Sequence, residues 1–304
     1  YCSFQADKIL YNGKIFTGDS GNKWAEAVAI YDRFIIAVGD DETVMQLAGP
    51  GTEKIDVRGN LVIPGINDAH MHVMPLNING DMLNHSSALL GPGPSLDELT
   101  AMVTQATGTQ PAGSWLYVAI GNIILDNPVI DRAFLDQLAP NHPLALFYMH
   151  TLIINTTAMR EVGISETEPD PFGGIYERYP GTNVFNGRMH EYAFYEFVRK
   201  ISMAAPDSTL RGVYADYMEN AVALGITSTQ DLPIGLTHGK AFEILNGMDL
   251  KMRVRLINVP LTREEALSAP RTFRLRPFWA KLTTTGVKWF NDGTVLERNG
   301  AVIA

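Results

Sequence analysis

Helical and extended patterns alternate along the C-terminal third of the chain, and this alternation constrains the fold more than any other feature. Residues 209–224 show helical spacing and stop before Gly225, a residue type that commonly follows the last helical turn. Extended segments at 226–229, 252–259 and 287–290 are separated by helical ones. Because parallel strands need such crossover helices, the pattern predicts an α/β fold with βα units, and a TIM-type (β/α) barrel is favoured.

The first part of the chain, residues 1–63, predicts a small β-sandwich-like module. Short alternating segments are punctuated by turn residues, and Asn12-Gly13 is the strongest of these turn signals. We expect three hairpins, formed by residues 7–16, 27–39 and 54–63.

The barrel is expected to occupy residues 64–304 and to be interrupted after its first strand. Residues 84–215 lack the regular strand-helix alternation and are predicted to be an insertion over the active-site face. Within it, the Pro- and Gly-rich residues 168–187 predict a loop, and residues 96–105 and 191–200 predict helices.

Charge and cysteine content exclude several classes of function. The 304 residues include 33 acidic and 24 basic ones, a net charge of -9, which argues against a nucleic-acid or anionic-membrane surface. No apolar run approaches the ~20 residues of a transmembrane helix. The single cysteine, Cys2, excludes an intrachain disulfide. We favour a cytoplasmic protein with a small-molecule substrate. The alternative location is the bacterial envelope, with a lipid on Cys2.

His70 and His72 are the candidate metal ligands. Residues i and i+2 of a strand point to the same side, so both imidazoles can reach one cation. Neutral imidazole binds zinc, iron, nickel and manganese. The alternative is two ordinary histidines at the end of a strand, because a bare His-x-His pattern is common.

The surrounding residues resemble a known family. Residues 59–72 (GNLVIPGINDAHMH) are similar to the V-x-P-G-x-x-D-x-H-x-H signature of the amidohydrolase superfamily. There, the strand that carries this signature leaves a small β domain and becomes the first barrel strand. Four further segments resemble the amidohydrolase-3, YtcJ-like branch: residues 131–143, 150–159, 223–231 and 286–294.

The resemblance implies roles for further residues. Lys288 would be a third metal ligand, carbamylated by CO2; the alternative is a structural lysine paired with Asp292 or Glu297. His150, Glu191 and Asp292 would lie at the substrate, and Asp231 would orient a ligand histidine from the second shell or, alternatively, cap a helix. The remaining histidines, among them His85, His190 and His238, are expected to have no role in the site.

The implied activity is hydrolysis of a C–N bond of the amide, N-acyl or N-formyl type. One or two divalent cations are expected, with zinc favoured over iron, manganese or nickel. Alternatives are an ester, lactone or phosphotriester hydrolase of the same superfamily, or a binding or assembly module without catalysis. The family has two more histidines and a catalytic aspartate after the lysine strand. No histidine follows Lys288, so we expect an N-terminal portion of a longer protein, completed by a C-terminal segment or within a homo-oligomer.

Overall fold

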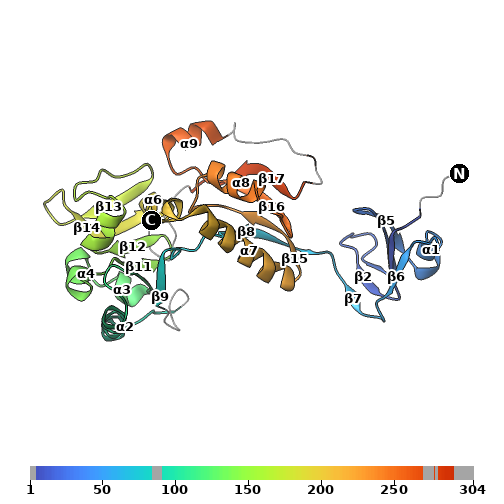
Figure 1. The fold of residues 1–304 in the computed structure, drawn as a ribbon, viewed down its shortest axis with the longest axis horizontal. Helices are drawn as coiled ribbons and strands as arrows, with labels where there is room; N and C mark the ends of the chain where they lie inside the picture. Colours follow the sequence, from blue (N-terminus) through green and yellow to red (C-terminus); the bar gives the residue numbers. More distant parts are fainter. Residues whose placement is uncertain (1–4, 84–90, 270–276, 278–279, 291–304) are drawn as a thin grey trace. The chain divides into compact units, whose positions relative to one another are not determined.

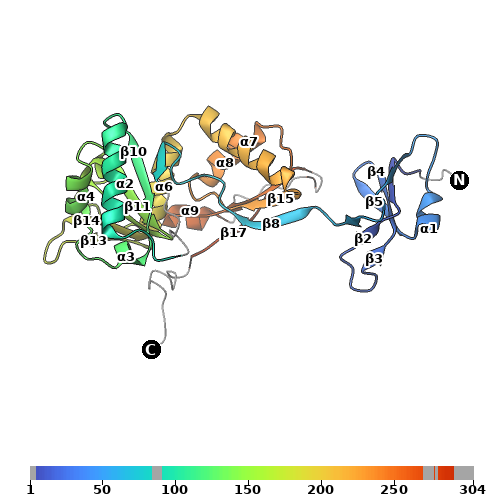
Figure 2. The same ribbon diagram turned by 90° about the horizontal axis from the view of Figure 1, so that it is seen from below.

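The computed structural model describes residues 5–83, 91–269, 277 and 280–290. The chain divides into two compact units, Tyr1–Ile66 and Asn67–Ala304, shown from two sides in Figures 1 and 2.

The N-terminal unit contains two small sheets around a compact apolar core. One sheet has the order β5-β4-β1-β6 and the other β3-β2-β7. Ile9, Ala27 and Ala29 are fully buried between the first sheet and helix α1, and Val44 of that helix is nearly so. The elements are β1 (Lys8–Tyr11), β2 (Lys14–Phe16), β3 (Trp24–Ala25), β4 (Ala27–Tyr31), β5 (Phe34–Gly39), α1 (Asp41–Met45), β6 (Glu53–Asp56) and β7 (Leu61–Val62).

Only one of the three predicted hairpins in this unit forms. Strands β4 and β5 pair antiparallel, as expected. The predictions for residues 7–16 and 54–63 are wrong, because β1 pairs in parallel with β6, and β2 in parallel with β7. Asn12, at φ 53°, lies where the chain passes from one sheet to the other, and its carbonyl accepts a hydrogen bond from Gly59 N–H. The turn signal was therefore real, but it marks a change of sheet.

The second unit contains a six-stranded sheet with the order β13-β14-β12-β11-β10-β9. Both faces of its central strands are covered, so strands such as β10 are buried throughout instead of alternating. The elements are β9 (Gly80–Leu83), α2 (Leu96–Thr109), β10 (Trp115–Ala119), α3 (Asn122–Leu125), α4 (Arg132–Leu138), β11 (Leu144–Tyr148), β12 (Thr151–Ile154), α5 (Thr156–Glu161), β13 (Gly174–Arg178), β14 (Phe185–Glu191) and α6 (Tyr192–Ala204).

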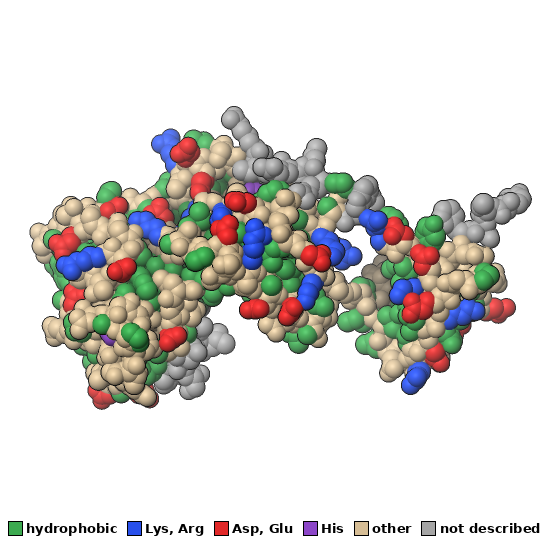
Figure 3. Space-filling view, viewed as in Figure 1, with side chains coloured by type: hydrophobic (Ala, Val, Ile, Leu, Met, Phe, Trp, Pro, Cys, Tyr) green, Lys and Arg blue, Asp and Glu red, His purple; other side chains and the backbone are tan. Residues whose placement is uncertain are grey.

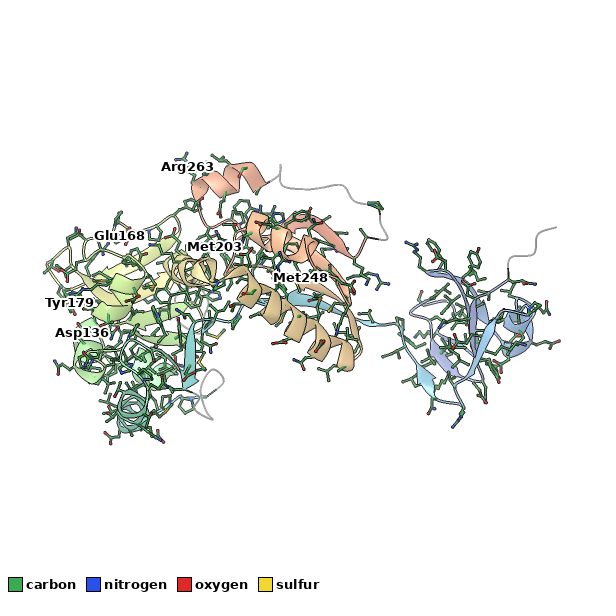
Figure 4. All side chains as sticks on the ribbon, in the orientation of Figure 1. Asp136, Glu168, Tyr179, Met203, Met248 and Arg263 are labelled. Atoms are coloured by element: carbon green, nitrogen blue, oxygen red, sulfur yellow. The ribbon has the colours of Figure 1, made fainter. Side chains whose placement is uncertain are left out.

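The two helices predicted in this region form as α2 and α6, whereas the predicted loop does not form. Helix α2 begins at Ser95, whose hydroxyl accepts from Glu98 N–H while the Glu98 carboxylate accepts from Ser95 N–H. The loop predicted for residues 168–187 is wrong, because it contains β13 and the start of β14, which pair antiparallel. Helices α4 and α5 are joined by Asp136, labelled in Figure 4, which accepts hydrogen bonds from the N–H and hydroxyl of Thr156.

The other sheet of this unit has four strands in the order β17-β16-β15-β8 and carries the βα units predicted from the sequence. Strands β15, β16 and β17 pair in parallel. Two hydrogen bonds join β8 to the β15 segment, between Asn67 and Ser228 and between Met71 and Leu232. The residues of each pair are 161 positions apart in the sequence, so both strands advance in the same direction and β8 is parallel to β15. The elements are β8 (Ile66–Met71), α7 (Asp207–Ala223), β15 (Ile226–Asp231), α8 (His238–Asn246), β16 (Arg253–Asn258), α9 (Arg263–Ser268) and β17 (Leu282–Val287).

The two faces of this four-stranded sheet differ. Val254, Leu256 and Leu282 are buried in the same apolar cluster as residues of α7 and α8. The opposite face borders a hollow of about 280 Å³ lined by polar side chains, including Ser228, Gln230 and Arg255. Strand β17 ends at Val287, so the strand predicted for 287–290 is displaced and Lys288 directly follows it. Within the described residues the sheets are open: the α/β class is found, and a closed barrel is not.

Candidate metal centre

Three side chains predicted as metal ligands lie together at one end of the four-stranded sheet. His70 is on β8, His72 follows that strand, and Lys288 follows β17. The Nε2 atoms of His70 and His72 are 3.3 Å apart, and Lys288 Nζ is 3.1 Å from His70 Nε2. These groups meet because parallel strands place their carboxyl ends at the same edge of a sheet. His70 and Lys288 are therefore in contact although they are 218 residues apart in the sequence.

The spacing of the two imidazoles fits a divalent cation. Two nitrogens bound tetrahedrally to zinc at ~2.0–2.1 Å would be about 3.3 Å from each other. The observed Nε2–Nε2 distance of 3.3 Å matches this separation. Within residues 5–83, 91–269, 277 and 280–290, no group of three or more His, Cys, Asp or Glu side chains is placed to hold a metal.

His72 is oriented for this task by a backbone carbonyl. Its Nδ1 lies 2.6 Å from Leu232 O, so Nδ1 carries the proton and donates it, and the lone pair is on Nε2. Burial lowers the pKa of His72 to about 4, which keeps the ring neutral at ordinary pH. A neutral imidazole with a fixed Nε2 lone pair is the form that binds metals. Sequence reasoning missed Leu232, because a backbone carbonyl carries no residue signature.

The other two groups also disfavour a proton. Burial, followed by repulsion from the Lys288 ammonium, lowers the pKa of His70. Burial lowers the pKa of Lys288 itself. All three pKa values are lowered, so each group binds a proton less tightly. A metal cation at the two imidazoles, and CO2 at the Lys288 amine, therefore meet less competition from protons.

Asp231, predicted to orient a ligand histidine from the second shell, lies beside this cluster and hydrogen-bonds to the chain next to His72. Its fully buried carboxylate accepts hydrogen bonds from Tyr214 hydroxyl at 2.7 Å and from Val73 N–H at 3.3 Å. Among the described residues its hydrogen bonds go to these two groups and not to the His72 ring. Val73 directly follows His72, and Asp231 directly precedes Leu232. The hydrogen bond between Val73 N–H and Asp231 therefore joins the two chain segments beside the His72–Leu232 contact. Burial raises the pKa of Asp231 to about 6, although both hydrogen bonds lower it.

A pH-dependent stability follows from Asp231. Its folded-state pKa lies above the ordinary value of 3.8, so this group stabilises the fold as pH falls through 6. The quantity to compare is the difference between the free energies of unfolding of wild type and of Asp231→Asn. We expect this difference, wild type minus variant, to be about 1 kcal/mol larger at pH 5 than at pH 7. His72 acts with the opposite sign but is present in both proteins. Urea titrations at the two pH values measure the difference; a constant difference would contradict the buried-carboxyl assignment.

The predicted substrate residues His150 and Glu191 lie together. His150 Nδ1 is 3.2 Å from Glu191 Oε2, and the His150 ring packs against Phe194, Tyr195 and Phe290. Phe290 in turn lies under the Lys288 ammonium, at 4.6 Å from Nζ to the ring centroid. The Phe290 ring therefore contacts both His150 and Lys288.

The other predicted residues are elsewhere or outside the described ranges. Asp292, Glu297 and His85 are outside the described residues. His190 bonds to Thr151 and Glu177 on neighbouring strands, and His238 begins helix α8.

Comparison with known proteins gives this geometry a context. The sequence model described as "Amidohydrolase family" matches residues 53–302, most of the chain. The chain belongs to the amidohydrolase family. Two curated relatives of this amidohydrolase are an N-substituted formamide deformylase of Arthrobacter pascens, 32% identical over 178 residues, and the putative amidohydrolase YtcJ of Bacillus subtilis (strain 168), 28% identical over 175 residues. These matches cover 57% and 55% of this chain, and 32% of each relative.

A solved structure shares the fold of this amidohydrolase. An uncharacterized metal-dependent hydrolase from Pyrococcus horikoshii OT3 aligns with a TM-score of 0.60 at 19% identity, over 95% of this chain and 55% of that chain. The amidohydrolase thus spans about half the length of this structural relative. Among the described residues, none of the helices has both the length and the apolar character needed to cross a membrane. On the face shown in Figure 3, acidic and basic side chains of residues 67–304 are interspersed.

Proposed function

We propose that this chain is the metal-binding portion of a hydrolase that cleaves a C–N bond of the amide, N-acyl or N-formyl type. The observation that carries the proposal is the convergence of His70, His72 and Lys288, with two imidazole Nε2 atoms at the separation of zinc ligands. We expect one or two cations, with zinc ahead of iron, manganese or nickel. Such a cation, when bound, activates water and polarises the scissile carbonyl.

Lys288 would join His70 and His72 in the ligand set as a carbamate. Its neutral amine adds to CO2, so that an N–C bond forms and one proton passes to solvent. The product carries one negative charge, shared by two oxygens, in place of a cation. The lowered pKa of Lys288 supports this step, because only the unprotonated amine reacts. The role of Asp231, through Val73 and Leu232, is to keep His72 in place.

The four-stranded sheet is proposed as the first half of a TIM-type barrel. Strands β8, β15, β16 and β17 form one sheet, and helices α7 and α8 pack on one face of it, as helices do on barrel strands. The chain spans half of its structural relative, so the remaining strands, with a proton-shuttling carboxylate, would come from further residues of the protein. The six-stranded sheet would then be the insertion after barrel strand 1.

The preference for C–N bonds rests on relatives, whose names include an N-substituted formamide deformylase. We expect N-formyl and N-acyl amines to be hydrolysed by the zinc-loaded protein at least tenfold faster than matched esters, relative to each uncatalysed rate. The measurement is product formation on paired amide and ester substrates, with His72→Asn as the inactive control. A preference for the ester, lactone or phosphotriester would overturn the C–N assignment, and metal-loaded protein without any hydrolysis would favour a binding module.

A further inference from the structure

The corner that holds His150 and Glu191 has an unusual backbone. Met149 and Glu191 have φ of 48° and 53°, in the left-handed region that residues other than glycine rarely adopt. Such a conformation is strained, and surrounding contacts must maintain it. Two hydrogen bonds join the corner: Glu191 N–H donates to His150 O at 2.9 Å, and the side chains meet at 3.2 Å.

The Glu191 side chain is largely buried but does not cap the helix that follows it. Glu191 precedes helix α6, where a carboxylate commonly caps the first turn, but it makes no capping hydrogen bond. Its side chain is only 14% exposed, and Oε1 is buried without a hydrogen-bond partner among the described residues. A buried carboxylate oxygen without a partner is costly. The one side-chain contact that the carboxylate makes is with the His150 ring.

We propose that Glu191 is a positioning residue that fixes the tautomer of His150. The carboxylate accepts the proton of Nδ1, so the neutral ring has its lone pair on Nε2. The packing of His150 against Phe194, Tyr195 and Phe290 fixes the ring plane at the same time. The Phe290 ring that contacts His150 also lies under the Lys288 ammonium. His150 would then meet the substrate through Nε2 as an acceptor. Only this last step rests on the proposed function.

This assignment separates the two residues, which the sequence had placed together at the substrate. His150 would contact substrate, whereas Glu191 would act through His150. A carboxylate beside the imidazole selects one tautomer, because it accepts but cannot donate.

Nitrogen-15 NMR of the imidazole groups tests the proposal on the 304-residue chain without metal or substrate. The His150 signals are identified by their loss in His150→Gln. We expect wild type to show His150 with the proton on Nδ1. In Glu191→Ala the ratio of the Nδ1–H to the Nε2–H form should fall about tenfold or more, since a charge-assisted hydrogen bond is lost.

Two further variants keep the result interpretable. Glu191→Gln is isosteric and keeps the packing if the alanine variant unfolds; its amide can donate to Nδ1, so an Nε2–H signal should appear. Glu177→Ala removes the carboxylate of the other Glu–His pair, whose partner is His190 at 2.6 Å, and should leave His150 unchanged. An Nε2–H form in wild type, or an unchanged Nδ1–H form in folded Glu191 variants, would overturn the proposal. Because no turnover is measured, failure of the proposed hydrolase activity would be seen separately.

Discussion

Replacing His72 by asparagine is expected to reduce the zinc bound to the purified chain to background, from about one ion per chain in wild type. His72 is the better fixed of the two imidazoles, because Leu232 O holds its Nδ1 proton and its pKa of about 4 excludes a competing proton. Loss of an outer-shell partner already weakens metal binding about 10–100-fold. Loss of the ligand itself should therefore lower the affinity by at least ~100-fold.

The measurement is metal content by plasma mass spectrometry after dialysis against limiting zinc. His70→Asn should behave like His72→Asn, because both Nε2 atoms belong to one pair. His238→Gln, at the start of helix α8, removes a histidine outside the cluster and should retain the wild-type content. Equal zinc in wild type and both cluster variants would show that the metal lies elsewhere. Wild type without zinc would remove the basis of the proposed function.

The largest loss of stability is expected from Asn155→Ala. The Asn155 side chain is fully buried and makes four hydrogen bonds to backbone groups. Its Oδ1 accepts from Leu144 N–H and Ala158 N–H, and its Nδ2 donates to Ala139 O and His142 O. Alanine would leave these four groups without their partner and would remove the cap of helix α5. We expect the free energy of unfolding to fall by about 3–4 kcal/mol.

Urea denaturation followed by circular dichroism measures this loss. Asn220→Ala is the matched control, because Asn220 is exposed on α7 and donates only to Asp216 O within its own helix. That change should stay within about 0.5 kcal/mol. A loss at Asn155 no larger than at Asn220 would mean that water or neighbouring groups replace the four hydrogen bonds.

The role of Asn155 shows the limit of a motif. The segment around it was informative as a resemblance, but the sequence could not show whether the asparagine meets a ligand or the backbone. The structure resolves this, since all four hydrogen bonds are internal. The turn signal at Asn12-Gly13 has a similar limit: it indicated a sharp change of direction, and only the pairing of β1 with β6 showed that the chain changes sheet there.

Sequence by itself determined the features that depend on local periodicity and on residue type. The βα alternation after residue 209, the helix at residues 96–105 and the His70-x-His72 pair are all visible without a partner segment. Contacts between distant segments were decided by tertiary structure alone. The Leu232 carbonyl that orients His72, the Glu191 carboxylate at His150 and the approach of Lys288 to His70 join residues 41 to 218 positions apart. The physical reason is that parallel pairing brings the ends of strands together whatever their separation in the sequence. In addition, the role of a backbone carbonyl or a buried carboxylate depends on the groups that the fold places beside it.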